Sequence, residues 1–254
     1  MVYDYEYFKK EVYKLTKIDL NAYKEKQMKR RIDTLIAKNG VSGYENYVKC
    51  LQTDAKRFEE FVNYLTINVS EFYRNPDQWE LLDKEVIPGL INRFGKDLKI
   101  WSAACSTGDE PYSLVMALSR HLPLSHIHII ATDIDKQVIE KAKIGLYTEK
   151  SIAAVPGDLT KVGASYQIAQ EIKDCVEFKQ HNLLKDEYPT HCHMIVCRNV
   201  LIYFTEEAKE EVFAKFSKSL IPEGCLFIGS TEQIIQYKDM GYYRMNSFFY
   251  GKNK

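Results

Sequence analysis

The sequence contains no apolar run long enough to cross a membrane, and its first residues, MVYDYEYFKK, lack the apolar stretch of a secretory signal peptide. It also lacks an excess of either charge: lysine and arginine together number 35, as do aspartate and glutamate, so no overall basic field attracts nucleic acid. The six cysteines lack the spacing of a disulfide framework. These absences predict a cytoplasmic protein with reduced thiols that neither enters a membrane nor binds nucleic acid.

Residue types that bind zinc occur close together in HCHMIVC, namely His191, Cys192, His193 and Cys197. The part from His193 to Cys197 has the pattern of a strand, in which alternate side chains face opposite ways and cannot converge on one ion. We therefore expect no metal site here, and we interpret Cys197 as a small core residue at a strand end.

Residues 1 to about 90 repeat apolar side chains at helical spacing, whereas strands and helices alternate after Lys96. The alternation predicts a mostly parallel, doubly wound α/β sheet. We place a helical N-terminal domain at residues 1–75 and the α/β domain at residues 76–254. Residues 148–174 are too long and too poorly patterned for a simple loop, which indicates a small insertion with YQIAQEI as a candidate strand.

Proline and threonine mark several predicted helix boundaries. Pro76 lies near the start of one helix, and Pro88–Gly89 are expected to interrupt it. Thr205 is a suitable N-cap for the last long helix, and residues 222–224, Pro-Glu-Gly, are expected to end it.

The segment WSAACSTGDEPYS, residues 101–113, joins a predicted strand to a predicted helix but contains one glycine, Gly108. A dinucleotide pyrophosphate favours several glycines at such a turn, because they let backbone N–H groups approach it. Asp109 and Glu110 instead suit a ligand that carries an ammonium group and no phosphate. The alternative is that both acids only stabilise the start of the helix.

Polar residues also follow the next predicted strands. Asp133 ends IIATD, where a carboxylate can accept hydrogen bonds from ribose hydroxyls, while Asp135 is better placed to cap the following helix. An aspartate at a strand end is also often only a cap. Asn182 ends another strand, where its amide could bind an adenine edge while Leu183 packs on the ring.

Arg198 and Asn199 follow the strand IVC, and Tyr203 comes soon after them. A polar pair at a strand end beside an aromatic residue is typical of a binding site. The alternative is that Arg198 forms a salt bridge and Tyr203 belongs to the core.

The segment LTINVSEFYRN lies before the sheet and places Asn68, Ser70 and Arg74 among apolar neighbours. It could form a lid over the ligand. The alternative is a helix start in which Ser70 is the N-cap and Glu71 lies in the first turn.

The order of these segments resembles the CheR-type chemotaxis receptor methyltransferases, which use S-adenosylmethionine. The resemblance runs from about residue 60 to the C-terminus. It rests on the segments LTINVSEFYR, WSAACSTGDEPYSLVMAL, ATDIDKQVIEKAKIGLY, HNLL, CRNVLIYF and, more weakly, CLFIGSTE. It implies a Rossmann-like methyltransferase domain, an all-helical N-terminal domain and a small β-subdomain in the insertion.

The resemblance also implies which residues bind S-adenosylmethionine: Asn68, Ser70, Arg74, the acid after Gly108, Asp133, Asn182, Leu183, Arg198 and Asn199. The family often has Glu directly after the glycine and Thr in place of Ser70. The sequence therefore leaves open whether Asp109 or Glu110 pairs with the ammonium group of the cofactor.

The implied reaction is methyl transfer to the γ-carboxylate of glutamates on the cytoplasmic helices of chemoreceptors, which yields glutamyl methyl esters for chemotactic adaptation and S-adenosylhomocysteine. A carboxylate is already ionised at neutral pH, so the reaction needs no general base. In-line placement and exclusion of water should supply the catalysis. We assign Arg74 and Tyr203 to the neighbourhood of the reacting carboxylate, and we expect a monomer.

The helical pattern of residues 21–38 combines an apolar stripe with basic residues. The stripe consists of Met28, Ile32, Leu35 and Ile36, and the basic residues beside it are Lys24, Lys26, Arg30, Arg31 and Lys38. Such a run is usually a solvated face. Given the resemblance, it predicts a docking surface for the acidic receptor bundle.

Two other functions compete with this prediction. A nucleic-acid methyltransferase could use the basic helix on phosphates, but the zero net charge and the absence of an Asn/Asp-Pro-Pro-aromatic motif oppose it. The other is a non-catalytic regulator that binds the cofactor or a receptor without turnover.

Overall fold

The computed structural model describes residues 3–155, 157 and 159–254. The chain divides into two units: residues up to 68 form the first together with residues 201–211, and residues 69–200 and 212–254 form the second. None of the helices in the described part of the chain combines the length and the apolarity that crossing a bilayer requires.

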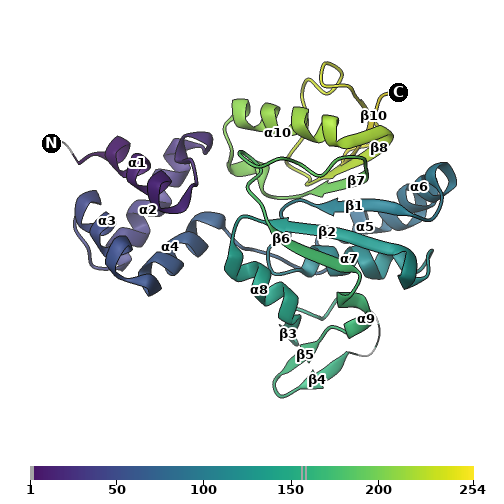
Figure 1. Ribbon diagram of the computed structural model, residues 1–254, viewed down its shortest axis with the longest axis horizontal. Helices are drawn as coiled ribbons and strands as arrows, with labels where there is room; N and C mark the ends of the chain where they lie inside the picture. The colour runs from purple at the N-terminus through teal and green to yellow at the C-terminus, as the bar shows by residue number, and fades with distance from the viewer. Residues whose placement is uncertain (1–2, 156, 158) are drawn as a thin grey trace. The chain divides into compact units, whose positions relative to one another are not determined.

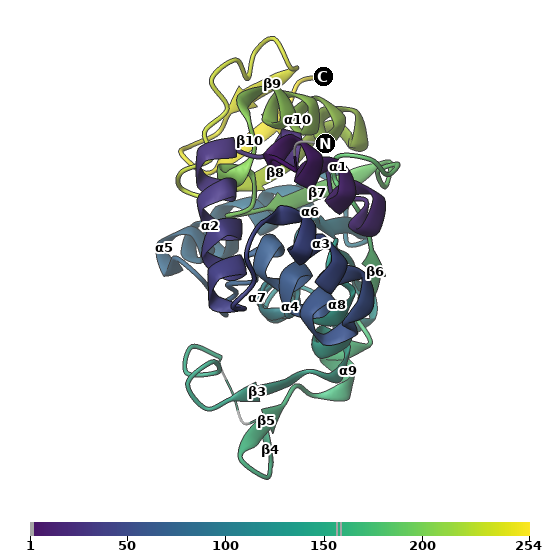
Figure 2. The ribbon, with the colours of Figure 1, turned by 90° about the vertical axis from the view of Figure 1, so that its left-hand side faces the viewer.

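The first unit is helical, as expected, and its helices can be followed in Figure 2. They are α1 (Tyr5–Thr16), α2 (Glu25–Lys38), α3 (Tyr44–Thr53), α4 (Ala55–Thr66), the short 3-10 helices Leu20–Ala22 and Leu201–Tyr203, and the start of α10 (Glu206–Ser219). Phe8, Tyr47 and Phe61 are fully buried and pack ring against ring at its centre. Large rings remove much apolar surface from water, so these three contribute strongly to this small core.

The second unit contains a sheet of the described strands β6 (Val176–Gln180), β2 (Ile127–Asp133), β1 (Leu98–Ser102), β7 (Cys192–Cys197), β8 (Leu220–Ile228), β10 (Phe249–Lys252) and β9 (Tyr242–Arg244), in that spatial order. The strands from β6 to β8 are parallel, and β10 is antiparallel to both of its neighbours. The strand order reverses between β1 and β7, and ligands bind at such a reversal beyond the carboxyl ends of the strands.

Helices cover both faces of this sheet (Figure 1). Those of the second unit are α5 (Pro76–Leu81), a π-helical turn (Leu82–Val86), α6 (Ile87–Phe94), α7 (Asp109–Leu118), α8 (Lys136–Ile144), α9 (Gln170–Lys173) and the end of α10. Ile100 of β1 belongs to the cluster that includes Leu114 of α7, while the adjacent Trp101 packs on Phe216 of α10. Neighbouring residues of a strand point to opposite faces, so both faces of β1 are buried, and its residues are apolar except for Lys99 and Ser102.

A small antiparallel sheet projects from the end of α8, as both ribbon views show, and its described strands are β3 (Leu146–Thr148), β5 (Ser165–Gln167) and β4 (Thr160–Val162). It confirms the expected insertion, of which positions 156 and 158 lie outside the described residues. The candidate strand YQIAQEI is right only in its first residues, because Gln170 already begins α9.

Three boundary predictions are wrong, each because of local or tertiary contacts. Ser70 is not a helix N-cap, since α4 ends at Thr66 and the next helix begins at Pro76. Pro88–Gly89 do not interrupt the helix. A proline ring inside an α-helix normally clashes with the carbonyl group four residues earlier, but the π-helical turn before Pro88 widens the helix and avoids this clash. Residues 222–224 lie inside β8, because α10 ends at Ser219 and pairing with β7 begins at Leu220.

Candidate functional site

A pocket lies in the second unit where the strand order reverses. Its lining residues are Val69, Ser70, Glu71, Arg74, Ala104, Ser106, Glu110, Arg198 and Asn199. They come from the segment before α5, from the turn between β1 and α7, from the first turn of α7, and from the residues directly after β7. Five residues predicted from the sequence thus line one pocket: Ser70, Arg74, Glu110, Arg198 and Asn199.

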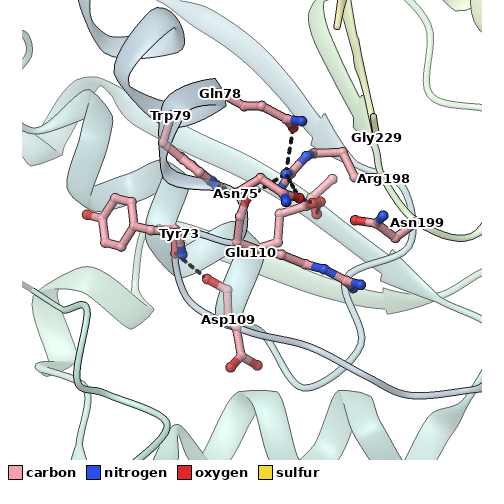
Figure 3. A network of polar contacts seen from close by, with 12 residues as sticks. Tyr73, Asn75, Gln78, Trp79, Asp109, Glu110, Arg198, Asn199 and Gly229 are labelled. Atoms are coloured by element: carbon pink, nitrogen blue, oxygen red, sulfur yellow. Dashed lines mark hydrogen bonds and ion pairs between the residues drawn. The ribbon is translucent and has the colours of Figure 1, made fainter. Parts of the chain in front are cut away.

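Arg198 links two sides of this pocket (Figure 3). The residue is 6% exposed, and one guanidinium nitrogen donates to the backbone oxygen of Arg74 at 2.6 Å and to Oε1 of Gln78 at 2.8 Å. The other lies 3.7 Å from Oε2 of Glu110, and the group also lies over the ring of Phe227. A buried guanidinium with these partners fixes residues 74–78 against the end of β7.

Two acids line the pocket, of which Glu110 is largely buried and Glu71 is exposed. The side chain of Glu110 is 12% exposed, and Oε1 accepts a hydrogen bond from Oγ of Ser102 at 2.8 Å. Burial raises the pKa of this carboxyl to about 7, while the charge of Arg198 acts in the opposite direction. A carboxyl in this setting can pair with a cationic ligand group.

Asp109 has a different place, and Figure 3 shows its carboxylate away from Arg198. It is 3% exposed and accepts a 2.6 Å hydrogen bond from Oγ1 of Thr107 within the same turn. Gly108 before it has a φ of 93°, and a Cβ there would lie 2.9 Å from Cβ of Ala142. The one glycine of the turn is therefore required by its backbone conformation and by close packing.

Asp133 ends β2 and is 8% exposed. Its Oδ2 accepts a hydrogen bond at 2.8 Å from the backbone N–H of Ser106, which lines the pocket, and its Oδ1 accepts one from the N–H of Asp135. Burial raises the pKa of Asp133 to about 6. Each carboxylate oxygen can accept a further hydrogen bond. Asp135 caps α8 through the N–H of Gln137, as predicted.

Asn182 and Leu183 follow β6 in a tight turn. The N–H of Asn182 donates to Oδ2 of Asp186 at 2.8 Å, and its Oδ1 accepts from the N–H of Leu184 at 2.9 Å. Leu183 is buried. The turn fixes the direction of the Asn182 amide, which the sequence could not specify.

Two buried polar atoms of the pocket lining, Oγ of Ser106 and Nε of Arg198, have no hydrogen-bond partner among the described residues. Such atoms are rare in folded proteins because they lose their contact with water without compensation. A ligand with several polar groups would satisfy them, so the pocket suits a polar molecule.

The remaining predicted residues belong to the first unit. Asn68 donates a hydrogen bond to Oγ1 of Thr66. Tyr203 lines a second pocket, whose other lining residues are Lys24, Gln27, Met28, Arg30, Arg31 and Ile67, and its backbone oxygen accepts from the N–H of Lys24 at 2.9 Å. The apolar stripe of α2 is confirmed, because Met28, Ile32, Leu35 and Ile36 are all buried.

The basic residues beside that stripe differ in their contacts. Arg31 donates to the backbone oxygen of Tyr64 at 2.7 Å, and Lys38 forms an ion pair with Glu60 at 2.8 Å. Lys26 and Arg30 are exposed. The exposed pair is therefore the part of the helix best placed to meet another molecule.

Sequence reasoning missed two buried polar residues near the pocket. Gln78 binds Arg198, and Glu232 accepts hydrogen bonds from the backbone N–H groups of Asn199, Val200 and Gly229. Gln78 lies in a helix, where a single polar residue gives no signal. For Glu232, the only available signal was the polar segment GSTE directly after a strand.

Two family models match the chain: "CheR methyltransferase, all-alpha domain" over residues 3–66 and "CheR methyltransferase, SAM binding domain" over residues 68–247. The "Chemotaxis protein methyltransferase" of Listeria innocua is 41% identical over 254 residues, which cover 98% of this chain and 97% of the relative. The protein of the same name from Escherichia coli is 30% identical, covering 87% and 81%. Among solved structures, a TehB-like SAM-dependent methyltransferase from Corynebacterium glutamicum matches at a TM-score of 0.42 and 15% identity, covering 80% and 95%.

Proposed function

Because the chain belongs to the CheR methyltransferase family and is thus an S-adenosylmethionine-dependent enzyme, we propose that it methylates γ-carboxylates of glutamates on chemoreceptor cytoplasmic helices. The observation that carries the proposal is the placement of Glu110 and Arg198 in one pocket at the strand reversal. An acid and a guanidinium match the ammonium and carboxylate groups of an amino-acid ligand. The turn before α7, with its one glycine, is not built for a pyrophosphate.

The residues that would hold the cofactor follow from this placement. Glu110 would pair with the ammonium group, and Asp133 would accept hydrogen bonds from the ribose hydroxyls. Asn182 and Leu183 would contact the adenine, while Ser70, Arg74, Arg198, Asn199 and Asn68 would complete the site. Asp109 would support the turn rather than bind the ligand, because its carboxylate is bonded to Thr107. When bound, S-adenosylmethionine supplies an electrophilic methyl group on a sulfonium sulfur.

The chain's contribution to the transfer step would be positioning. None of the described residues that line the pocket is a histidine or a lysine, the side chains most often used as general bases. A glutamate substrate needs none, because its carboxylate is ionised at neutral pH. Arg74 is half-buried in the lining and would orient that carboxylate, and we also propose Tyr203 for a role toward the same carboxylate. A weak contact suffices, since a strong ion pair would stabilise the ground state.

The receptor would dock on α2. Its basic residues are Lys24, Lys26, Arg30, Arg31 and Lys38, of which Lys26 and Arg30 are the most available to an acidic partner. The pocket that contains Tyr203 lies on the same helix. We further propose a cytoplasmic monomer in which residues 1–75 serve receptor docking and residues 76–254 serve methyl transfer, with Asn68, Ser70 and Arg74 added to the transfer site from the end of the first segment.

The test is to incubate the purified protein with methyl-labelled S-adenosylmethionine and receptor cytoplasmic fragments. We expect label on receptor glutamates, located by mass spectrometry, and its release by mild alkali because esters hydrolyse readily. Alkali-stable label on nucleic acid would instead identify a nucleic-acid methyltransferase. Cofactor binding without transfer to any receptor fragment would identify a regulator.

A further inference from the structure

Glu232 lies after β8 and is 2% exposed, and its carboxyl group accepts hydrogen bonds from backbone N–H groups at the end of β7 and in its own loop. Its Oε2 accepts from the N–H of Asn199 at 2.6 Å and from that of Gly229 at 2.9 Å, and its Oε1 accepts from the N–H of Val200 at 2.9 Å. One side chain therefore accepts hydrogen bonds from three backbone N–H groups, which together form a concavity suited to an anion.

The turn that Glu232 holds is not a relaxed one. Asn199 has a φ of 62°, in the left-handed region that costs most residues energy and that asparagine tolerates better than others. A Cβ on Gly229 would lie 2.5 Å from Oε2 of Glu232, so a side chain there would displace the carboxyl group. Figure 3 shows Asn199 and Gly229 beside Arg198. The loop after β8 is thus shaped around this carboxyl group.

The same turn connects the two functional parts of the chain. Arg198 and Asn199 line the pocket, and the chain continues from Val200 into the segment that carries Tyr203. A change of a few tenths of an ångström in this turn would move Arg198 relative to its partners Gln78 and Glu110. Supporting contacts of this kind decide how well a site is preorganised.

We propose that Glu232 is a positioning residue for methyl transfer: its carboxyl group fixes the turn at Asn199 and Val200, and so sets the positions of Arg198 and Asn199 in the cofactor pocket. This inference rests on the proposed function, since it takes the pocket to be the S-adenosylmethionine site. Glu232 itself lines neither pocket of the two described above.

Charge offers a second way to detect this role. The negative charge of Glu232 is one of the influences that raise the pKa of Glu110. Replacing Glu232 by a neutral residue should therefore lower the pKa of Glu110 and extend cofactor binding to lower pH. A substitution that displaces the carboxyl group but leaves its charge should not remove that influence.

The experiment compares Glu232→Gln and Gly229→Ala with the wild type by calorimetry with S-adenosylhomocysteine from pH 5.5 to 8. In Glu232→Gln, an amide NH₂ faces at least one backbone N–H, and we expect affinity at pH 8 to fall about tenfold, which corresponds to about 1.4 kcal/mol. Gly229→Ala should lose affinity similarly. The midpoint of the pH dependence should move to lower pH in Glu232→Gln and stay in place in Gly229→Ala. Asp239→Asn, which removes an exposed acid from the same C-terminal segment, should match the wild type.

Both variants are measured below their melting temperatures, so that loss of fold is not scored as loss of affinity. Wild-type affinity and an unmoved midpoint in Glu232→Gln would overturn the inference. If Glu232→Gln does not fold, Glu232→Asp tests the inference instead, because it keeps the charge but is one methylene shorter. Unchanged affinity of Glu232→Asp for S-adenosylhomocysteine would overturn the inference, and a tenfold loss would support it. Absence of binding by the wild type would instead contradict the proposed function.

Discussion

Replacing Glu110 by glutamine removes the acid of the proposed cofactor pocket that lies beside Arg198. Glutamine keeps the length of the side chain and can still accept the hydrogen bond from Ser102. It cannot pair electrostatically with a ligand ammonium group. The substitution therefore separates the charge of Glu110 from its shape.

The pKa of Glu110 sets how affinity should depend on pH. With a pKa of about 7 in the ligand-free protein, about 90% of the molecules are ionised at pH 8 and about 10% at pH 6. The ammonium group pairs with the ionised form, so wild-type affinity should fall about tenfold between pH 8 and pH 6. The Gln variant should bind more weakly at pH 8 and change little from there to pH 7. Below that, Asp133 also titrates, since its pKa is about 6.

The same substitution should raise stability. The pKa of Glu110 in the fold lies above its ordinary value of 4.5, so the folded state binds the proton more tightly and loses stability as pH rises from 4.5 through 7. The difference corresponds to about 3 kcal/mol as an upper bound. Glu110→Gln should therefore melt several degrees higher than the wild type at pH 8 and close to it at pH 4.5.

Calorimetric titration at pH 8, 7 and 6 measures the affinity, and thermal melts at pH 8 and 4.5 measure the stability. Proton release on binding near pH 7, seen as a dependence of the binding heat on the buffer, gives an independent check. A flat wild-type affinity from pH 8 to pH 6, or a Gln variant that keeps the full wild-type pH dependence, would refute the reasoning.

Three further predictions concern other parts of the chain. The double variant Lys26→Glu/Arg30→Glu should reduce receptor methylation at least tenfold while cofactor affinity stays unchanged, and an equal loss of both would contradict the docking role; Lys56→Glu, an exposed lysine on α4, is the control. Arg198→Lys should weaken cofactor binding and lower the melting temperature, because a single ammonium cannot replace the bonds to Arg74 and Gln78 together. Gly108→Ala should lower the free energy of unfolding by about 1–3 kcal/mol in chemical denaturation. The φ of 93° opposes a side chain at this position, and the added Cβ would lie 2.9 Å from Cβ of Ala142. Unchanged stability would show that the turn adjusts freely.

Much of the site followed from the order of strands and polar residues. Asp133, Arg198 and Asn199 each come directly after a predicted strand, and parallel strands bring their carboxyl ends to one edge of the sheet. The choice between Asp109 and Glu110 did not follow, because adjacent residues of a helix differ in direction by about 100° and the first turn's rotation depends on packing. Here the carboxylate of Asp109 accepts from Thr107 and that of Glu110 accepts from Ser102, a difference that depends on the folded structure.

Other features depend on contacts between distant parts of the sequence. Ser70 has every local property of an N-cap, but two long-range hydrogen bonds hold the segment around it in a non-helical conformation. Arg198 donates to the backbone oxygen of Arg74, and the N–H of Tyr73 donates to Oγ of Ser113. Glu232 acts on a turn more than thirty positions earlier. No local pattern reports such contacts, so propensity alone could assign neither residue.

The charges around the pocket explain how it keeps its shape without a ligand. Glu110, Arg198, Glu232 and Arg74 act on one another electrostatically, two acids against two guanidinium groups, so the charges of these four groups largely balance. An arrangement already balanced in this way needs little rearrangement when a ligand with both ammonium and carboxylate groups arrives. The raised pKa of Glu110 shows that the negative charge of this residue is not fully compensated, because desolvation outweighs the attraction of Arg198. A ligand cation beside Glu110 would supply the missing positive charge, which makes this carboxyl the position where binding energy is gained most directly.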